Sequence, residues 1–367
     1  MKVLFVLEYY DPHIGGVETL FKSLAHQLAQ NGHEITVVTN RYDSKLKTYE
    51  SVDGVEVYRY RFYNRYLFTF FAWISGLRHA EDADLIHTTS YNAALPAWII
   101  AKIKKKDVII TFHEYWGKLW FQLPWLNPIS RFLNSTFERM IVKLSFKKII
   151  AVSDYTQSAL SDAGVGVDRL ERIYNGIQYS DFEDFNQLQE KGETFNFLFY
   201  GRVGYSKGLD VLLNAVSNLK SEKPYKVKLI LPNEPLLQKV NGLIDKLGIS
   251  KSIISIEQSV PFTQLKKEIA DADAVVIPSY SEGFCYAAVE TMAIGTPIIT
   301  SGRGALSEVV TGQYINYDSV EASDLSRAMT QAMRGEWSVT DQVKFPLQHT
   351  IDQYVELYES LNHIAPN

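Results

Sequence analysis

Residues 274–300 read AVVIPSYSEGFCYAAVETMAIGTPIIT, and they carry the clearest folding signal in the chain. The apolar runs predict strands at 274–278 and 298–300, and the residues between them predict a helix at 287–294. A glycine turn lies on each side of this helix, as expected at changes of chain direction. Strands that alternate with helices favour a parallel sheet covered on both faces. The stretch therefore indicates an α/β fold.

The same alternation extends over the rest of the chain. Before residue 195 it predicts a helix at 17–30 and strands at 3–7, 35–39, 55–60, 85–88, 108–112 and 149–152. After residue 195 it predicts strands at 197–200, 226–231 and 253–256, and helices at 209–219, 236–247, 265–272 and 349–361. The absence of a repeat period argues against a solenoid.

The length of the chain predicts two domains. A single hydrophobic core stops growing at about 250–300 residues, and this chain has 367. Residues 179–194 are acidic, rich in glutamine and aperiodic, which is typical of a linker. We therefore expect one Rossmann-like domain at 1–180, completed by the C-terminal residues 350–367, and a second at 181–349.

Composition excludes several classes of protein. The formal net charge of −5 gives no electrostatic footprint for nucleic acid. Cys285 is the one cysteine, which excludes a disulfide framework and favours a reducing, cytosolic setting. The longest uncharged aromatic run, 66–77, is shorter than the roughly 20 residues of a spanning helix. We expect a cytoplasmic protein, either soluble or peripheral to the inner face of a membrane.

Gly15 and Gly16 lie between the first expected strand and the first expected helix. Glycines at this place let the backbone approach a ligand, and the helix N-terminus favours a phosphate. A plain tight turn explains the pair equally well. The glycine fingerprint of nicotinamide enzymes is absent here, which disfavours an oxidoreductase.

Two cations follow the strand at 197–200. Gly201 and Arg202 come at the end of this strand, Val203 is next, and Lys207 lies four residues after Val203. Ligands of open α/β sheets bind at the carboxyl ends of the strands, and Arg202 could contact a diphosphate through two hydrogen bonds. A solvated basic loop is the alternative.

Two glutamates frame the helix at 287–294. Glu282 precedes this helix, and Glu290 lies inside it among apolar neighbours. A carboxylate in such surroundings needs hydrogen-bonding partners, and the hydroxyl groups of a sugar or ribose would serve. A structural glutamate held by backbone N–H groups remains an equal alternative.

His113 and Cys285 each allow two interpretations. His113 ends the strand at 108–112, which favours a functional role, although a single histidine is commonly packed or on the surface. Cys285 precedes a helix whose N-terminus could lower its pKa, but a small buried side chain explains it better.

Together these motifs resemble glycosyltransferase family 4. The resemblance rests on order and spacing along nearly the whole chain, in Gly15-Gly16-Val17-Glu18, His113, Asn175-Gly176, Gly201-Arg202, Lys207-Gly208, and Glu282 with Glu290. It implies the GT-B fold, in which two Rossmann-like domains face each other across a cleft and a C-terminal helix crosses back to the first domain. One departure is that Cys285-Tyr286 stand where the family often has Gly-Leu, so the identity of the donor sugar does not carry over.

The resemblance also implies roles at matching positions. Arg202 and Lys207 would bind the donor diphosphate and stabilise its developing charge, and Glu290 would hold the ribose. Glu282 would contact the donor sugar, and His113 would lie against it. The other implied donor-binding positions are Gly15, Gly16, Asn175, Gly201, Val260, Gly283, Phe284 and Cys285. For the base, the turn at Val260 and the loop after Leu231 are the expected sites. No metal or other cofactor is implied.

The implied reaction is retaining transfer of a hexosyl group from a nucleoside-diphosphate sugar, first UDP and second GDP. The acceptor would be a glycan or a lipid-linked hydroxyl in cell-surface polysaccharide or glycoconjugate synthesis. A nucleotide-sugar 2-epimerase of similar fold is an alternative, and a non-catalytic nucleotide-sugar-binding subunit is another.

The N-terminal half contains segments that suggest an anionic membrane as a partner. Residues 58–73 are dense in aromatics and arginines, 116–125 add tryptophans, 102–106 are rich in lysine, and 139–148 alternate basic with apolar residues. Basic amphipathic surfaces of this kind bind anionic bilayers. An ordinary charged helix face over a core is the alternative.

Overall fold

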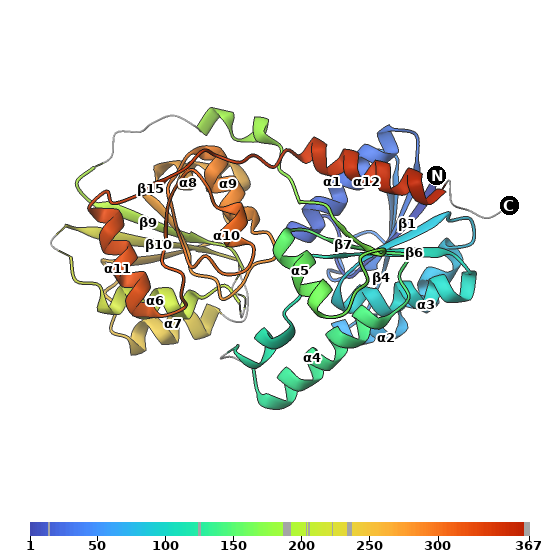
Figure 1. Cartoon of the computed structure of the whole chain (residues 1–367), viewed down its shortest axis with the longest axis horizontal. Coiled ribbons are helices and arrows are strands. Elements are labelled where there is room, and N and C mark those ends of the chain that lie inside the picture. The colour runs from blue at the N-terminus through green and yellow to red at the C-terminus, as the bar shows by residue number, and fades with distance from the viewer. Residues whose placement is uncertain are drawn as a thin grey trace. The chain divides into compact units, whose positions relative to one another are not determined.

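The computed structural model describes residues 1–13, 15–123, 126–185, 192–202, 204, 206–221, 223–232 and 237–362. The chain divides into two compact units. The N-terminal unit comprises Met1–Gln122, Asn127–Gly176 and Leu347–Asn367, and the C-terminal unit comprises Leu123–Leu126 and Ile177–Pro346. Figure 1 shows a twisted sheet with flanking helices in each unit.

The sheet of the N-terminal unit has the strand order β3-β4-β2-β1-β5-β6-β7-β8. Its strands are β1 (Lys2–Leu7), β2 (Glu34–Asn40), β3 (Tyr49–Val52), β4 (Val55–Tyr60), β5 (Leu85–Thr89), β6 (Asp107–Phe112), β7 (Lys148–Ala151) and β8 (Leu170–Arg172). Its helices are α1 (Gly16–Gln30), α2 (Arg65–Gly76), α3 (Ala94–Lys104), α4 (Pro128–Lys143), α5 (Asp154–Asp162) and α12 (Leu347–Asn362). Pairing is parallel except between β3 and β4.

Side-chain alternation along β1 explains the layers of this unit. Val3, Phe5 and Leu7 pack on one face with α1 and α12, where Tyr354 and Tyr358 are buried. Leu4 and Val6 pack on the opposite face, against residues of α3 and α4. The C-terminal helix therefore belongs to the core of the N-terminal unit, as expected.

The sheet of the C-terminal unit has the order β11-β10-β9-β12-β13-β14-β15. Its strands are β9 (Phe195–Tyr200), β10 (Tyr225–Leu231), β11 (Ile254–Gln258), β12 (Ala274–Ile277), β13 (Ile298–Thr300), β14 (Gln313–Asn316) and β15 (Ser338–Val339). Its helices are α6 (Leu209–Asn218), α7 (Leu237–Lys246), α8 (Phe262–Asp271), α9 (Tyr286–Ile294), α10 (Leu306–Val309) and α11 (Ala322–Met333). Pairing is parallel except between β14 and β15.

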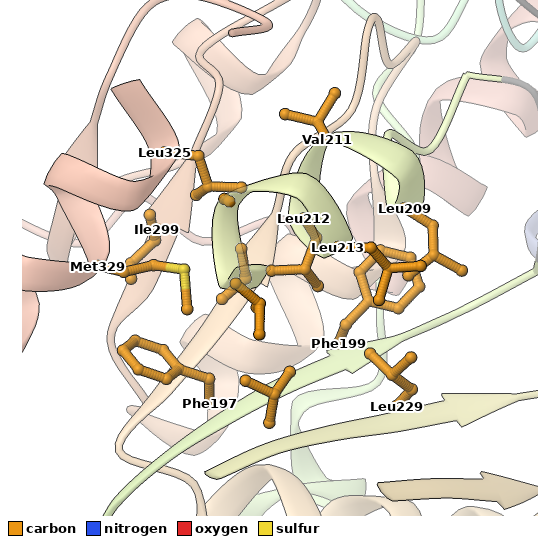
Figure 2. Packing of buried hydrophobic residues seen from close by; sticks show 14 of the residues in the cluster. Phe197, Phe199, Leu209, Val211, Leu212, Leu213, Leu229, Ile299, Leu325 and Met329 are labelled. Carbon is orange, nitrogen blue, oxygen red and sulfur yellow. The ribbon is translucent and has the colours of Figure 1, made fainter. Parts of the chain in front are cut away.

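Figure 2 shows how α6 and α11 cover one face of this second sheet. Phe197 and Phe199 of β9 point toward Leu212 of α6 and Met329 of α11 in the same buried cluster. Tyr200 comes next along β9 and therefore points to the other face, where its hydroxyl donates to the carbonyl of Ala287 in α9 at 2.7 Å. The alternation thus aims Tyr200 at the helix that carries Glu290.

The predicted α/β fold with two Rossmann-like halves is confirmed, and the expected strands and helices agree with those observed to within a few residues. The edge strands β3, β8 and β15, and β14 next to β15, were not predicted, because they are short and mostly exposed or half-buried.

The described part of the expected linker is packed rather than free. Phe182 is buried, and its ring centroid lies 5.8 Å from that of Phe262. Lys266 Nζ donates to the carbonyl oxygen of Asp181 at 2.5 Å. The rest of that segment, 186–191, lies outside the described residues. Apart from the short segment Leu123–Leu126, the chain passes between the units at Gly176 and Ile177, and again at Pro346 and Leu347.

Candidate functional site

Each sheet has a switch point beside its first strand. In the C-terminal unit β9 lies between β10 and β12, and in the N-terminal unit β1 lies between β2 and β5. The connections after the central strands leave in opposite directions there, and ligands of open α/β sheets bind outside the carboxyl ends of the strands at this point. The residues that follow β9 and β12 therefore form the first candidate site.

The loops after β9 and β12 are joined by a salt bridge. Lys207 Nζ lies 2.7 and 2.8 Å from the two carboxylate oxygens of Glu282, and Ser279 Oγ donates to Oε1 of the same carboxylate at 2.6 Å. Glu282 is buried, while Lys207 is about one-third exposed. A carboxylate in such a place requires partners, and these two supply them. The sequence predicted both charged residues but not Ser279.

Close backbone packing holds the same loops together. The N–H of Tyr280 donates to the carbonyl of Ser206 at 2.7 Å. Gly208 has φ 66°, and a Cβ atom there would lie 1.9 Å from the carbonyl oxygen of Pro278. A Cβ atom on Gly304 would lie 2.4 Å from the carbonyl oxygen of Glu282. Only glycine fits either position.

Arg202 lies on the loop after β9 and is exposed. It follows Gly201, whose φ of 136° favours glycine. Val203, part of the same predicted motif, lies outside the described residues. The two predicted cations thus differ, since Lys207 is engaged by Glu282 and Arg202 faces solvent.

Glu290 lies on α9 beside the end of β9. The Tyr200 hydroxyl is 3.3 Å from Glu290 Oε2 and 3.1 Å from Thr291 Oγ1. Burial raises the pKa of Glu290 to about 7, and the hydrogen bond from Tyr200 opposes this rise. The sequence analysis did not single out Tyr200, although a polar residue at the carboxyl end of an apolar strand can indicate a binding site.

The turn between Glu282 and Glu290 is compact. Gly283 and Phe284 are buried, and the Phe284 ring packs edge-on against Phe345 at 5.3 Å. Cys285 is buried with φ 77° at the start of α9, and burial raises the pKa of its thiol. The buried-side-chain interpretation of Cys285 therefore holds, and the thiol is not activated.

The two expected base-reading positions lie farther along the same sheet edge. Val260 follows β11, which is separated from β9 by β10. It is half-buried, between Ser259, which has φ 50°, and Pro261 at the N-terminus of α8. The loop after Leu231 is outside the described residues at 233–236.

The N-terminal unit has polar residues at its own switch point. Glu8 directly follows β1, and its Oε2 accepts from the side chain of Asn92 after β5 at 2.7 Å. Burial raises the pKa of Glu8. The sequence analysis did not include Glu8, although a carboxylate at the end of a central strand is a recognisable signal.

Gly15 and Gly16 begin α1 next to an acidic side chain. Glu18 is buried, and its Oε1 lies 2.9 Å from His13 Nδ1. A Cβ atom on Gly15 would lie 2.2 Å from Glu18 Oε2, so a larger residue at this position would displace the Glu18 carboxylate. The carboxylate lies in the first turn of the helix, where the helix dipole favours it.

His113 directly follows β6 and lies near α1. Its ring centroid is 6.3 Å from that of Phe21, and its Nε2 is buried without a hydrogen-bond partner among the described residues. Burial lowers the pKa of His113 to about 4, so the imidazole is neutral at pH 7.

Glu138 of α4 holds the loop after His113. It is fully buried, and its carboxylate accepts from the N–H groups of Trp116 and Gly117 at 2.9 and 2.7 Å and from the Tyr91 hydroxyl at 2.8 Å. This buried acid was not singled out from the sequence, because charged helix residues are normally exposed.

Asn175 follows β8 in the N-terminal unit. It is buried, and its Oδ1 has no hydrogen-bond partner among the described residues. The structure thus brings Lys207 and Glu282 together in the C-terminal unit, and it places Gly15, His113 and Asn175 in the N-terminal unit.

Two further observations concern membrane spanning and metal binding. Within the described ranges, no helix combines the length and apolar character needed to cross a bilayer. The same part of the chain holds no cluster of three or more His, Cys, Asp or Glu side chains arranged to bind a metal ion.

Family models match both units of the chain. "Glycosyltransferase Family 4" matches residues 14–180, and "Glycosyl transferases group 1" matches residues 180–355. The chain is 28% identical to an uncharacterised glycosyltransferase of Methanocaldococcus jannaschii, covering 84% of this chain and 83% of that protein. It is 24% identical to the alpha-monoglucosyldiacylglycerol synthase of Streptococcus pneumoniae, covering 91% and 78%.

Among solved structures, the chain is similar to Anabaena HepE in complex with UDP and glucose. The TM-score is 0.72 at 16% identity, with 98% of this chain and 100% of that chain covered. This likeness supports the fold, and the two family models with the relatives support the class of enzyme. The chain belongs to the GT-B glycosyltransferases of family 4 type.

Proposed function

We propose that this glycosyltransferase is a retaining hexosyltransferase that uses a nucleoside-diphosphate sugar, with UDP as the first choice of nucleotide and GDP as the second. The observation that carries the proposal is the Lys207–Glu282 salt bridge at the switch point of the C-terminal sheet, with exposed Arg202 on the same loop as Lys207. The complex of HepE with UDP and glucose supports the choice of UDP.

In this mechanism the bond between the anomeric carbon and the phosphate oxygen breaks, and the electron pair stays on the phosphate. Arg202 and Lys207 stabilise the charge that develops there, and fixed cations at such a place give the largest catalytic contribution. The acceptor hydroxyl attacks the same face of the sugar, and the leaving phosphate oxygen takes its proton. Glu282 orients the sugar and the Lys207 ammonium rather than forming a covalent bond.

Further residues are proposed to bind the donor. The carboxylate of Glu290 accepts hydrogen bonds from the ribose, and the buried turn at Gly283 and Phe284 lies against the sugar. Val260, Cys285, Gly201, Gly15, Gly16 and Asn175 complete the proposed donor set, with neutral His113 beside the transferred sugar. We propose that the reaction needs no metal, so chelation with EDTA should leave the rate unchanged.

The acceptor is a glycan or a lipid-linked hydroxyl bound by the N-terminal unit. The S. pneumoniae relative is named for a glucosylated diacylglycerol, which supports a lipid-linked acceptor. Such a reaction belongs to cell-surface polysaccharide or glycoconjugate synthesis, with the enzyme cytoplasmic and peripheral to the membrane.

The test is a panel of UDP- and GDP-hexoses in thermal-shift and hydrolysis assays. We expect one donor to stabilise the protein, and Arg202→Ala and Glu290→Ala each to abolish the shift. Arg334→Ala and Glu336→Ala, which change exposed residues of the same unit, are the matched controls. Donor binding by both site variants at wild-type strength would refute the assignment.

Product analysis separates the alternatives. Retention of the anomeric configuration in the transferred sugar is expected by NMR, and inversion would contradict the mechanism. Turnover that needs no acceptor and yields an isomeric sugar nucleotide would identify a 2-epimerase. Donor binding without turnover under any acceptor would identify a non-catalytic subunit.

A further inference from the structure

Helix α2 in the N-terminal unit exposes large apolar side chains on its outward face. The exposed residues are Tyr66, Leu67, Phe70, Phe71 and Ile74. At about 100° per residue they fall within an arc of about 140°, and the buried residues Phe68, Thr69, Ala72 and Gly76 fall on the opposite side. The outward face of a helix on a soluble domain is normally polar, but this face is apolar, and nothing in the described part of the chain covers it.

Helix α4 repeats the pattern with cations added. Ile129 and Phe132 are 73% and 62% exposed, and Leu133 and Met140 are exposed on the same side. Arg139 and Lys143 are exposed as well, and the helical spacing places them beside these apolar residues. The sequence analysis assigned the apolar residues of segment 139–148 to this surface. Two of them do not belong to it, because Ile141 and Phe146 are buried in the core.

The two helices lie on the same side of their sheet. Trp73 of α2 and Phe137 of α4 pack against one core cluster, and both helices contact the short turn Tyr91–Ala93 (Figure 1). We name their exposed apolar residues and cations the α2–α4 surface. Arg59, expected among the cations, does not belong to it, because it is buried and paired with Glu50.

The charge of this surface decides what covers it. Residues 57–80 contain no aspartate or glutamate, and Arg61 and Arg78 are exposed there. Arg65 is exposed as well, although it also pairs with Glu8 at 3.8 Å. The one acid of α4, Glu138, is fully buried. A symmetric dimer through this face would set cations against cations. An anionic bilayer offers acyl chains to the apolar residues and negative headgroups to the cations.

We propose that the α2–α4 surface docks the protein on anionic lipid bilayers, with the aromatic face of α2 inserted at the interface and Arg139 and Lys143 contacting headgroups. This deepens the peripheral location in the proposed function by assigning the surface and the lipid class. It does not depend on the proposed chemistry, because docking is measured without sugar nucleotide or acceptor.

The experiment is co-sedimentation of the full chain with vesicles of phosphatidylcholine, with and without phosphatidylglycerol. We expect binding to the anionic vesicles that weakens as salt rises from about 0.1 M to about 1 M. Phe70→Ser/Phe71→Ser/Ile74→Ser should weaken binding by at least about tenfold. Arg139→Ala/Lys143→Ala should weaken it by about tenfold or more.

Matched controls use exposed residues elsewhere in the same unit. Val167→Ser removes an apolar side chain that is 83% exposed, and Lys45→Ala/Lys47→Ala removes two exposed cations. Both should bind vesicles like the wild type, with thermal unfolding confirming that every variant folds. Wild-type protein that stays in the supernatant, or surface variants that bind normally, would overturn the proposal. A dimer abolished by the triple serine variant and unaffected by vesicles would overturn it in favour of a second copy.

Discussion

Glu290 is the residue whose protonation depends most on what occupies the site. Burial raises its pKa to about 7, and the Tyr200 hydroxyl donates a hydrogen bond to its Oε2 at 3.3 Å. Hydrogen bonds to a carboxylate favour the charged form. If ribose hydroxyls donate to Glu290, donor binding lowers its pKa and releases a proton at pH values below about 7.

We therefore expect UDP-glucose to bind roughly tenfold more weakly at pH 6 than at pH 8, since an acid of pKa about 7 is mostly neutral at the lower pH. Isothermal titration calorimetry at the two pH values measures this. Glu290→Gln should bind weakly with little pH dependence, and Glu336→Gln, which changes an exposed acid of the same unit, should keep the wild-type slope. A wild-type affinity that is equal at both pH values would exclude this role.

The charged residues of the site were predictable, but their pairing was not. Arg202, Lys207 and Glu282 each follow an apolar strand, and that order is visible in the sequence. The contact between Lys207 and Glu282 joins residues 75 positions apart, and only the strand order β9–β12 brings them together. Nothing local marks Ser279 as a partner of Glu282, because a serine after a strand is common in turns.

At the scale of elements, the start of α6 depends on one glycine. Gly208 has φ 66°, and its α-carbon lies so close to the end of β12 that an added Cβ atom would meet the carbonyl oxygen of Pro278 at 1.9 Å. This contact sets the distance between the loop carrying Lys207 and the loop carrying Glu282. The motif showed a glycine here, but the neighbour that requires it comes from the other strand.

Gly208→Ala should therefore destabilise the C-terminal unit and weaken donor binding. Gly248→Ala is the control, because Gly248 has nearly the same φ of 64° with nothing within 4 Å of an added Cβ atom. The control should cost about 1–2 kcal/mol from backbone conformation alone, and Gly208→Ala about 1–3 kcal/mol more from the clash. Urea unfolding measures both. Equal losses in the two variants would show that the packing contact is unimportant.

Helix periodicity also has a limit that α2 illustrates. The sequence of residues 65–76 is apolar nearly all round, which does not distinguish a buried helix from one with an exposed apolar face. Only the packing of Phe68 and Ala72 identifies the inward side. The sequence therefore indicated an aromatic segment, and the structure was needed to show which residues face solvent.

For the molecule as a whole, most of the architecture could be predicted because parallel strands buried on both faces leave long apolar runs. β1, β5, β9 and β12 are of this kind. The points where the chain passes between the units were harder to locate. The sequence around Gly176 and Ile177 has an ordinary composition, so nothing in it marks the passage between the units. The acidic segment that follows looked like a linker, but its Phe182 packs within the C-terminal unit.

Burial shifts the pKa values of three histidines in the N-terminal unit and of Glu290 in the C-terminal unit, with opposite effects on stability. Burial lowers the pKa values of His79, His87 and His113, all in the N-terminal unit, to about 4, 3 and 4. The unfolded chain takes up protons at these sites near pH 6.5. Their contribution to stability is therefore present above pH 6.5 and is lost as the pH falls toward 4 and 3. Glu8 and Glu138 oppose this loss, because burial raises their pKa values.

Glu290 gives the C-terminal unit the opposite dependence. Its pKa is raised, so its contribution to stability is present below about pH 4.5 and is lost as the pH rises through about 7. Between pH 7 and pH 5, therefore, the N-terminal unit should lose stability and the C-terminal unit should gain it. Hydrogen–deuterium exchange of the ligand-free protein measures the stability change of each unit separately. The labelling times are scaled for the intrinsic effect of pH on exchange. Peptides from β5 and β6 should lose protection at pH 5, and peptides from β9 and α9 should gain it. Glu290→Gln should remove the gain and leave the loss unchanged, whereas parallel changes in both units would contradict the assignment.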